Sequence, residues 1–406
     1  MAPHLRPLFT LVFLTLNHLL TAQPTQFHRG FLLKLTKDPQ THQHTTQLLI
    51  GTPQIPTKLL VHLSGHSLWL NCPPSSPSRN LITHGSLQCQ MAKSDGQNPE
   101  SGQPGQFGQF GQSGQSHTVC DVRQRNPITG ETGFGDLAED IVSVDGIRGP
   151  ISTVDRFLFS CSPEFLVNGL VNGAKGVLGF GKSKIGFQSQ MVNNFDFPRK
   201  FTVCLSSSDG FIFSGAGVSN SLTYTPLMSS TDGYYVNVNA IKINGRRLAG
   251  GSPTGGVEIS STVPYTVMKS SLFEVFVKAF VAAASSMNLT AVAPVAPFGV
   301  CFSSPATPVP EIELVLQSEL VKWRIQGRNL MVEVSDSVMC LGFVDGGLGM
   351  NGSMILGGHQ LEDHILEFNL GSGMMGFSSS LLMEGNSCSK IRGVVSSSSS
   401  TQRVSL

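Results

Sequence analysis

The chain has little charge: only 13% of its 406 residues are Asp, Glu, Lys or Arg, and the formal net charge at pH 7 is +1. Because basic and acidic residues are nearly equal in number, the charge gives no reason to expect a nucleic acid or an anionic surface as a partner. Long stretches with the apolar period of an amphipathic helix are scarce, whereas glycine is abundant, at 44 residues. Many short strands joined by turns are therefore expected, and an all-β chain is the first interpretation.

Long hydrophobic runs are also missing after the first residues, so no membrane span is expected. Residues 1–22 place Arg6 before a short apolar run and end in Leu20-Thr21-Ala22, which predicts a secretory signal peptide cleaved after Ala22. The rest of the chain has the length of two lobes of roughly 180 residues each. The expected organisation is a first lobe at 23–215, a second lobe at 216–390 and a flexible Ser-rich tail at 391–406.

No two cysteines have the CxxC spacing, which argues against a zinc site. All eight cysteines follow the expected signal peptide, and in a secreted chain such an even set is expected to form disulfides. Spacing alone leaves the pairing open. One of the first four cysteines could also be unpaired. Cys301 and Cys340, which bracket the later strands of the second half, are the favoured pair.

Two Asn-x-Ser/Thr tripeptides begin at Asn288 and Asn351 and are candidate glycosylation sites. Asn351 follows a Gly-rich turn and is the better candidate, although an unused tripeptide is the alternative for each. Residues 94–117 form a Gly/Gln-rich insertion with little apolar surface, so we expect this segment to be flexible.

The most informative absence is chemical, because no Asp-Thr-Gly or Asp-Ser-Gly occurs anywhere in the chain. An aspartic protease needs two facing carboxylates that share a proton, so that one acts as base and the other as acid. The segment from Leu59 to Cys72 has the apolar frame that surrounds such a catalytic loop, including Leu68-Trp69. His62, however, stands where the first acid is expected.

The same order of parts occurs twice. The loop at His62 is followed by Gly-Val-Leu-Gly-Phe-Gly at 176–181, and a similar segment at 255–268 is followed by Met-Ile-Leu-Gly-Gly at 354–358. Each half thus pairs a loop with a hydrophobic-hydrophobic-Gly element, whose glycine permits close approach of two backbones. In the second loop Ser260 occupies the acid position, with an uncertainty of one residue.

With these parts the chain resembles the plant basic 7S globulin family, which includes aspartic-protease-like inhibitors of xylanases and xyloglucan endoglucanases. The resemblance covers nearly everything after the signal peptide. Its most specific stretches are 135–143, 156–161, 197–207, 222–227, 241–245 and 356–363. It implies an all-β, bilobal pepsin-like aspartic protease fold with a few short helices, secretion to the apoplast or cell wall, and a role in plant defence.

The sequence also suggests other chemistries, at these residues and elsewhere. His62 and Ser260 could form a base and nucleophile pair, but neither an orienting acceptor nor an oxyanion hole is identified. His62 and His66 on an extended strand would lie roughly 13 Å apart, too far for a shared metal ion. Residues 176–183 match the phosphate-binding pattern Gly-x4-Gly-Lys-Ser, yet no β/α repeat surrounds them. The segment 270–284 predicts a helix with a capping hydroxyl, which we expect to pack against its lobe.

The expectation is therefore a secreted, catalytically inactive protein, not an enzyme, with no cofactor, no metal and no nucleic-acid partner. Its partner would be a secreted glycoside hydrolase. The loop before the last cysteine, 381–387, contains no His, Arg or Lys, which counts against xylanase as the target. Three alternatives stay open: an active aspartic endopeptidase, a seed storage protein, and a protein that binds a peptide or hormone in its cleft.

Overall fold

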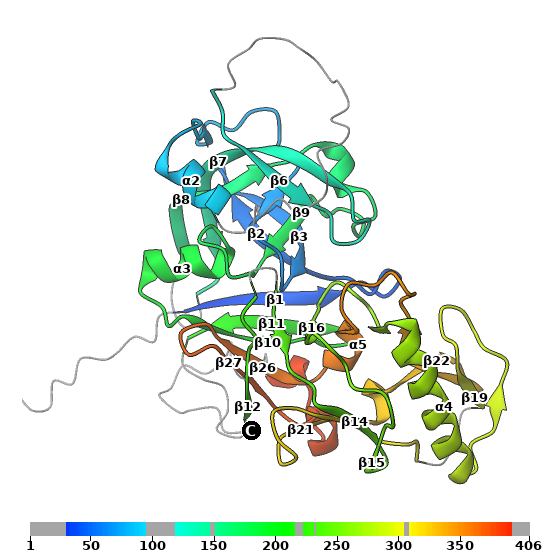
Figure 1. Ribbon diagram of the computed structural model, residues 1–406. Helices are drawn as coiled ribbons and strands as arrows, with labels where there is room; N and C mark the ends of the chain where they lie inside the picture. The colour runs from blue at the N-terminus through cyan, green and yellow to red at the C-terminus, as the bar shows by residue number, and fades with distance from the viewer. Residues whose placement is uncertain are drawn as a thin grey trace, which may run out of the picture.

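The computed structural model describes residues 30–94, 118–146, 151–215, 222–230, 233–303 and 308–391. The expected signal peptide, nearly all of the Gly/Gln-rich insertion and the Ser-rich tail after Ile391 lie outside the described residues. Strands dominate the described chain, and Figure 1 shows them gathered in two lobes. The fold is all-β and pepsin-like, as the sequence predicted.

The first half contains β1 (Phe31–Lys37), β2 (His44–Ile50), β3 (Ile55–His62), β4 (Trp69–Leu70), β5 (Asn80–Leu81), β6 (Asp121–Arg125), β7 (Thr132–Val144), β8 (Ser152–Cys161), β9 (Gly176–Gly179), β10 (Lys200–Cys204) and β11 (Asp209–Ser214). Its helices are α2 (Leu87–Ser94), the 3-10 helix η1 (Glu164–Val167) and α3 (Phe187–Phe195).

The second half contains β12 (Thr223–Pro226), β13 (Tyr235–Val236), β14 (Ala240–Ile243), β15 (Arg246–Arg247), β16 (Val257–Ile259), β17 (Thr266–Met268), β18 (Ala291–Val292), β19 (Cys301–Ser303), β20 (Ile312–Val315), β21 (Lys322–Ile325), β22 (Met331–Ser335), β23 (Val338–Leu341), β24 (Phe343–Asp345), β25 (Met354–Leu356), β26 (Ile365–Asn369) and β27 (Met374–Phe377). Its helices are α4 (Ser270–Ser286), the 3-10 helix η2 (Gly327–Asn329), α5 (Gly358–Leu361) and the 3-10 helix η3 (Leu381–Glu384).

One large sheet joins the two halves. Its strand order is β12-β27-β26-β10-β11-β1-β2-β3-β9-β4-β8-β7-β5, so second-half strands β12, β27 and β26 continue directly into first-half strands β10, β11 and β1. In Figure 1 these six strands lie across the middle of the molecule. Three smaller sheets complete the second lobe.

The repeat seen in the sequence is a repeat of strand pairing. In the first half β9 pairs in parallel with β3 and antiparallel with β4, and β4 in turn pairs in parallel with β8. In the second half β25 pairs in parallel with β16 and antiparallel with β17, and β17 pairs in parallel with β24. The predicted correspondence of the two loops and their glycine elements is confirmed.

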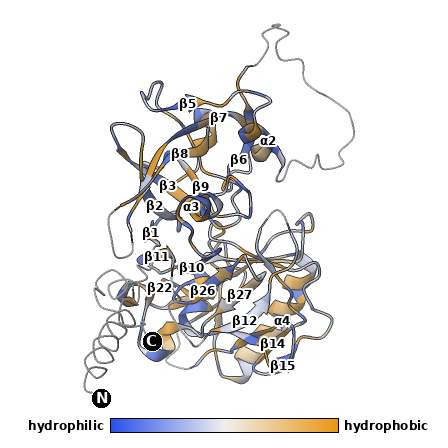
Figure 2. Ribbon diagram, turned by 90° about the vertical axis from the view of Figure 1, so that its left-hand side faces the viewer, coloured by the Kyte–Doolittle hydropathy of each residue, from blue (hydrophilic) through white to orange (hydrophobic). Residues whose placement is uncertain are grey.

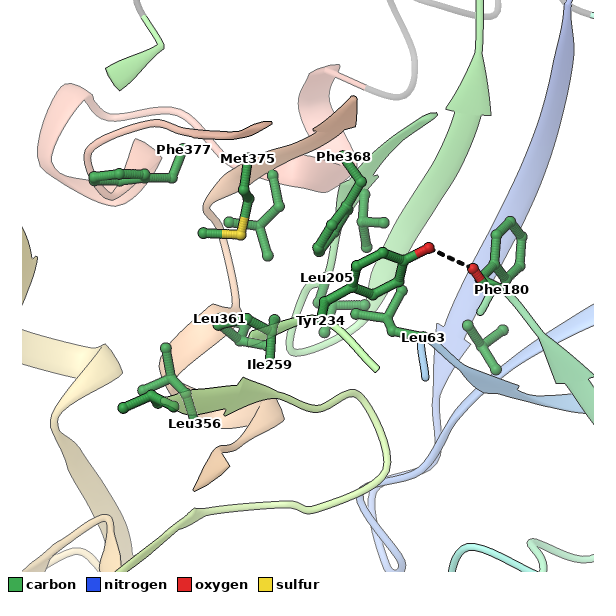
Figure 3. Close-up of a cluster of buried hydrophobic side chains, with 14 of the residues drawn as sticks. Leu63, Phe180, Leu205, Tyr234, Ile259, Leu356, Leu361, Phe368, Met375 and Phe377 are labelled. Atoms are coloured by element: carbon green, nitrogen blue, oxygen red, sulfur yellow. Dashed lines mark hydrogen bonds between the residues drawn. The ribbon is translucent and has the colours of Figure 1, made fainter. Parts of the chain in front are cut away.

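One cluster of buried hydrophobic residues runs through both halves. Leu63 and Phe180 of the first half lie beside Tyr234, Ile259 and Phe368 of the second, as Figure 3 shows. The Tyr234 hydroxyl donates a hydrogen bond to the Phe180 carbonyl at 2.7 Å. Figure 2 shows hydrophobic and hydrophilic residues interleaved along the strands of both lobes, which is typical of sheets that pack on a core. The lobes are therefore packed against each other as well as linked by shared strands.

All eight cysteines are paired, so no member of the first four is free. The pairs are Cys72–Cys161, Cys89–Cys120, Cys204–Cys388 and Cys301–Cys340. Two pairs lie within the first half and one within the second. The bridge between Cys204 and Cys388 joins the halves across a sequence separation of 184.

Helix α4 packs against its own lobe. Leu272, Phe276 and Phe280 are buried, and the Phe276 ring lies 5.0 Å from that of Phe343 on β24. The expected capping hydroxyl is wrong, because the N-cap is Lys269 and makes no side-chain cap. The Ser270 hydroxyl donates instead to the Asp345 carboxylate at 2.7 Å, since the neighbouring β24 brings that acceptor within reach. Within the described ranges, no helix has the length and apolar character needed to cross a bilayer.

Candidate functional site

The first loop begins where β3 ends, at His62. The chain turns there, because the His62 carbonyl accepts hydrogen bonds from the amides of Gly65 at 3.1 Å and Phe180 at 3.0 Å. The expected extended spacing of His62 and His66 is therefore wrong, since the turn interrupts the strand between them. Among the described residues no group of three or more metal-ligating side chains is found.

Glycine is required beside both loops. A Cβ on Gly179 would lie 2.4 Å from the Gly65 carbonyl oxygen, and a Cβ on Gly357 would lie 2.4 Å from the Tyr265 carbonyl carbon. No side chain fits at such distances, so each glycine lets a β-strand pass directly against the neighbouring loop. Residues 176–183 thus begin with the central strand β9, and the phosphate-loop interpretation does not describe their structure.

The strand register resolves the counterpart of His62. On one side His62 pairs with Gly179, the glycine of the first hydrophobic-hydrophobic-Gly element. On the other, Ile259 pairs with Leu356, so the next residue pair is Ser260 with Gly357. Ser260 therefore stands in the second half where His62 stands in the first, without the offset of one residue that the sequence had left open.

The Ser260 hydroxyl is used within its own loop. Its oxygen accepts from the amides of Thr262 and Val263, each at 3.3 Å, and lies 3.3 Å from the Thr262 hydroxyl. Ser260 is 3% exposed, and no hydrogen bond joins it to His62. The serine thus stabilises a turn and is not aligned as a nucleophile with an imidazole base.

A second hydroxyl, that of Ser261, holds the two loops together. It accepts a hydrogen bond from the Leu63 amide at 3.1 Å and donates one to the Val61 carbonyl at 2.9 Å. The residue after His62 is Leu63, which has no hydroxyl to return the contact. We call this contact the Ser261 clasp, and it runs in one direction only.

The electrostatics of the site are those of an isolated imidazole. Burial, and to a smaller extent the nearby positive charge of Arg125 on β6, lowers the pKa of His62 to about 4. His62 is therefore neutral at pH 7. Its ring makes no hydrogen bond to a side chain or carbonyl among the described residues.

Glu258, which the sequence interpretation missed, is a carboxylate beside these loops. It lies between the buried Val257 and Ile259 on β16, so its side chain points to the opposite face of the strand. Burial raises its pKa, while the Ser64 and Tyr235 hydroxyls and the Arg125 charge favour its ionised form. The alternation of Val257, Glu258 and Ile259 was the signal in the sequence that could have located it.

Among the described residues the two loops do not present the facing pair of carboxylates that an aspartic protease uses. Glu258 is the only carboxylate found here among the described residues, and one carboxylate cannot serve as base and acid together. His62 with a pKa of about 4 is a weak base at neutral pH. The residues bring together a neutral imidazole, a cation and one partly buried acid.

The remaining sequence candidates lie elsewhere. Asn288 follows α4 and Asn351 precedes β25, and both side chains are exposed. Ser353, the hydroxyl residue of the second tripeptide, is 7% exposed and donates to the Thr254 carbonyl at 2.8 Å. Both asparagines stay predictions as glycosylation sites.

The fold and the two loops define a bilobal aspartic-protease-like protein. The model for "Xylanase inhibitor N-terminal" matches residues 44–216, and the model for "Xylanase inhibitor C-terminal" matches residues 233–379. The chain belongs to this family of aspartic-protease-like proteins, together with the basic 7S globulins.

Similar proteins extend over nearly the whole length. "Probable aspartic proteinase GIP2" of Nicotiana benthamiana is 36% identical, with 94% of this chain and 95% of that protein covered. The crystal structure of basic 7S globulin from soybean has a TM-score of 0.78 and 33% identity, covering 90% of this chain and 99% of that one. Conglutin gamma, described as a basic 7S globulin from lupine seeds, gives a TM-score of 0.78 and 34% identity, covering 90% of this chain and 98% of that one.

Proposed function

We propose that this protein is a secreted, catalytically inactive member of the family that binds and inhibits glycoside hydrolases of the xylanase or endoglucanase type. The register of the two loops carries the proposal. His62 and Ser260 are structural counterparts, and neither can act as a catalytic carboxylate. The family's name and the intact two-lobed frame support a role in binding another protein.

Secretion to the apoplast or cell wall is part of the proposal. All eight cysteines are oxidised in four bridges, a pattern that persists in extracellular compartments and not in a reducing cytosol. His62 and Ser260 are then vestigial positions, and no cofactor is required for the proposed activity.

The direct test is inhibition of hydrolases by the purified protein. It is incubated with a panel of secreted plant and microbial xylanases and endoglucanases, and the residual release of reducing sugar is measured. A saturable loss of activity of at least one enzyme, at a fixed stoichiometry, is expected. No inhibition and no complex with any glycosidase, either in the panel or captured from apoplastic fluid and fungal secretome, would overturn the proposal.

The loop between Leu381 and Ser387 is a candidate contact surface. The Met383 side chain is 65% exposed on η3, close to the Cys204–Cys388 bridge that holds this end of the chain. If the loop contacts the hydrolase, Met383→Arg should raise the inhibition constant at least tenfold. Leu320→Arg is the matched control, because Leu320 is 94% exposed on the β20–β21 connection. Equal effects of the two substitutions would exclude a specific role of the loop.

An aspartic endopeptidase is the second candidate, since a relative is named a probable aspartic proteinase. Digestion of a denatured protein between pH 3 and 5 tests it, with a transition-state analogue of aspartic proteases as inhibitor. We expect no analogue-sensitive cleavage, because the second carboxylate is missing. Cleavage that the analogue blocks and that Glu258→Gln removes would show that Glu258 replaces a catalytic acid.

Storage in seeds is the third candidate, suggested by the lupine relative. It makes a different prediction from inhibition, because a storage protein needs no tight partner. High abundance in seeds together with failure in every hydrolase assay would favour it.

A further inference from the structure

A pocket of about 320 Å³ lies at one end of the shared sheet. The paired residues Lys200 of β10, Asn369 of β26, Met374 of β27 and Pro226 of β12 form one row across four strands. The residues next to this row converge on the pocket. Its lining includes Arg199, Leu227, Met228, Leu370, Gly373 and, from the loop after β9, Lys182.

The walls of the pocket are held by main-chain hydrogen bonds. The Leu370 amide donates to the Arg199 carbonyl at 2.8 Å, and the Leu227 amide donates to the Gly373 carbonyl at 2.8 Å. The Met228 amide donates to the Tyr235 carbonyl, also at 2.8 Å. Because both lobes contribute to this framework, the pocket is formed before a ligand arrives.

Two positive charges, those of Lys182 and Arg199, reach the pocket. The neighbouring Lys200 pairs with the Glu367 carboxylate at 3.1 Å. Among the described residues neither Lys182 nor Arg199 forms an ion pair. Arg199 also comes directly before Lys200, so two successive basic residues differ in this respect.

Lys182 is held in place but keeps donors to spare. Its ammonium donates to the Ser230 carbonyl at 3.0 Å and lies 5.4 Å from the centre of the Tyr234 ring. An ammonium group has three N–H donors, of which this contact uses one. Burial lowers the pKa of Lys182, so an anion beside it would offset the loss of hydration.

The lining also includes the apolar residues Leu227, Met228 and Leu370. A ligand that fits must therefore combine an anionic head with a hydrophobic body. A pocket of about 320 Å³ has room for a small molecule or for the terminal residue of a chain. Arg199 can hold a carboxylate with two parallel N–H donors, and Lys182 adds a compact positive charge beside it.

We propose that this pocket, which we call the Lys182/Arg199 pocket, binds a carboxylate attached to a small apolar group. The carboxylate lies between Lys182 and Arg199, and the apolar group contacts Leu227, Met228 and Leu370. This proposal is independent of hydrolase inhibition, because the pocket does not include His62, Ser260 or the loop at 381–387.

Titration calorimetry of the purified protein with a matched set of small molecules tests the pocket. Hexanoate and benzoate are expected to bind with a Kd on the order of a millimolar or below, which is normal for ligands of this size. Acetate lacks the apolar group, and hexanol and benzamide lack the charge, so each should bind at least tenfold more weakly. Equal binding of the neutral compounds, or binding of inorganic phosphate alone, would overturn the proposal.

Substitutions locate the binding. Arg199→Gln should weaken hexanoate at least tenfold, and Arg199→Lys should restore part of the affinity because it keeps the charge. Arg199 is exposed, so its replacement is not expected to unfold the chain, and the thermal midpoint of the variant checks this. Lys278→Gln on the exposed side of α4 is the control and should leave binding unchanged. Unaltered affinity in Arg199→Gln would place the ligand elsewhere.

A short peptide with a C-terminal leucine carboxylate, compared with its amide, distinguishes the source of the ligand. Tighter binding of the peptide acid than of hexanoate, lost on amidation, would assign the pocket to chain ends. Tighter binding of hexanoate would assign it to free organic acids.

Discussion

In each half of the molecule four corresponding strands surround a central loop, but the residues of the two loops differ. In the first half the position beside the glycine is His62, followed by the apolar Leu63. In the second half it is Ser260, followed by Ser261, whose hydroxyl reaches across to the first loop. Both halves have the same backbone geometry, and neither has an acid at the position beside the glycine. Only the second half has a hydroxyl that forms the Ser261 clasp.

This difference separates the requirements of folding from those of catalysis. The glycines leave room for neighbouring main chain, and the Ser261 clasp gives the Leu63 amide and the Val61 carbonyl a partner, so both serve the fold of this chain. The carboxylates are needed only for peptide hydrolysis. This chain keeps the first set and has His62 and Ser260 at the two positions of the second, which is the observation behind the proposed binding function.

The largest expected effect comes from replacing the glycine beside each loop, which tests whether the two halves are equivalent. Gly179→Ala and Gly357→Ala should each cost more than about 4 kcal/mol or prevent folding, because the new Cβ would overlap main-chain atoms at 2.4 Å. The free energy of unfolding in urea measures the effect. Gly349→Ala is the control, since no atom lies within 4 Å of its Cβ, and should change stability by less than about 0.5 kcal/mol. Tolerance of either substitution would contradict the equivalence of the two elements.

Disulfide removal compares a bridge between the halves with a bridge inside one half. Replacing Cys204 and Cys388 by alanine should destabilise the protein by roughly 3 to 5 kcal/mol. Replacing Cys301 and Cys340 should cost about 1.4 kcal/mol less, because the sequence separations are 184 and 39 and a shorter loop restores less entropy to the unfolded chain. Denaturant midpoints of the two double variants decide the order, and a reversed order would show that strain or lost packing dominates.

Acid should weaken both halves through buried histidines. Burial lowers the pKa of His44 in the first half and of His364 in the second to about 4. One ring nitrogen of each must donate to a carbonyl, that of Ser206 at 3.3 Å and that of Ser378 at 3.0 Å. The other nitrogen is buried without a partner, so adding a proton there creates an unsatisfied donor.

The sign follows from the two pKa values. The unfolded chain takes up these protons near pH 6.5 and the folded chain only near pH 4, so stability is full above pH 6.5 and falls as the pH drops towards 4. The loss is roughly 3 kcal/mol for each histidine. Thermal midpoints measured across this range should fall, and His364→Gln should flatten the decline. The same slope in the variant would show that His364 does not carry the effect.

The smallest expected effect tests the clasp. Ser261→Ala leaves the Leu63 amide and the Val61 carbonyl buried without a partner, at a cost of roughly 2 to 3 kcal/mol. Ser318→Ala on an exposed turn serves as the control and should be nearly neutral. Equal unfolding midpoints for the two variants would mean that water replaces the lost contacts.

The loops and their order could be predicted from the sequence because short motifs carry them. Gly-Val-Leu-Gly at β9 and Ile-Leu-Gly at β25 are local patterns with one structural meaning, and the two-lobed fold followed from their repetition. Glu258 was not found because its environment depends on Arg125 and Ser64, which are more than a hundred residues away. The pocket at Lys182 and Arg199 was missed because its apolar lining comes from Leu227, Met228 and Leu370, which only the folded sheet places beside these two basic residues.

The bridge between Cys204 and Cys388 also decides what a protease could do to this molecule. A cut at any peptide bond between these two residues leaves one piece with Cys204 and the other with Cys388, so the pieces stay covalently attached. The pairing of β10 with β26 would hold the same two pieces in place without the bond. A nicked chain would therefore migrate as one species in electrophoresis until it is reduced. Its folded surface would persist after the backbone has been cut.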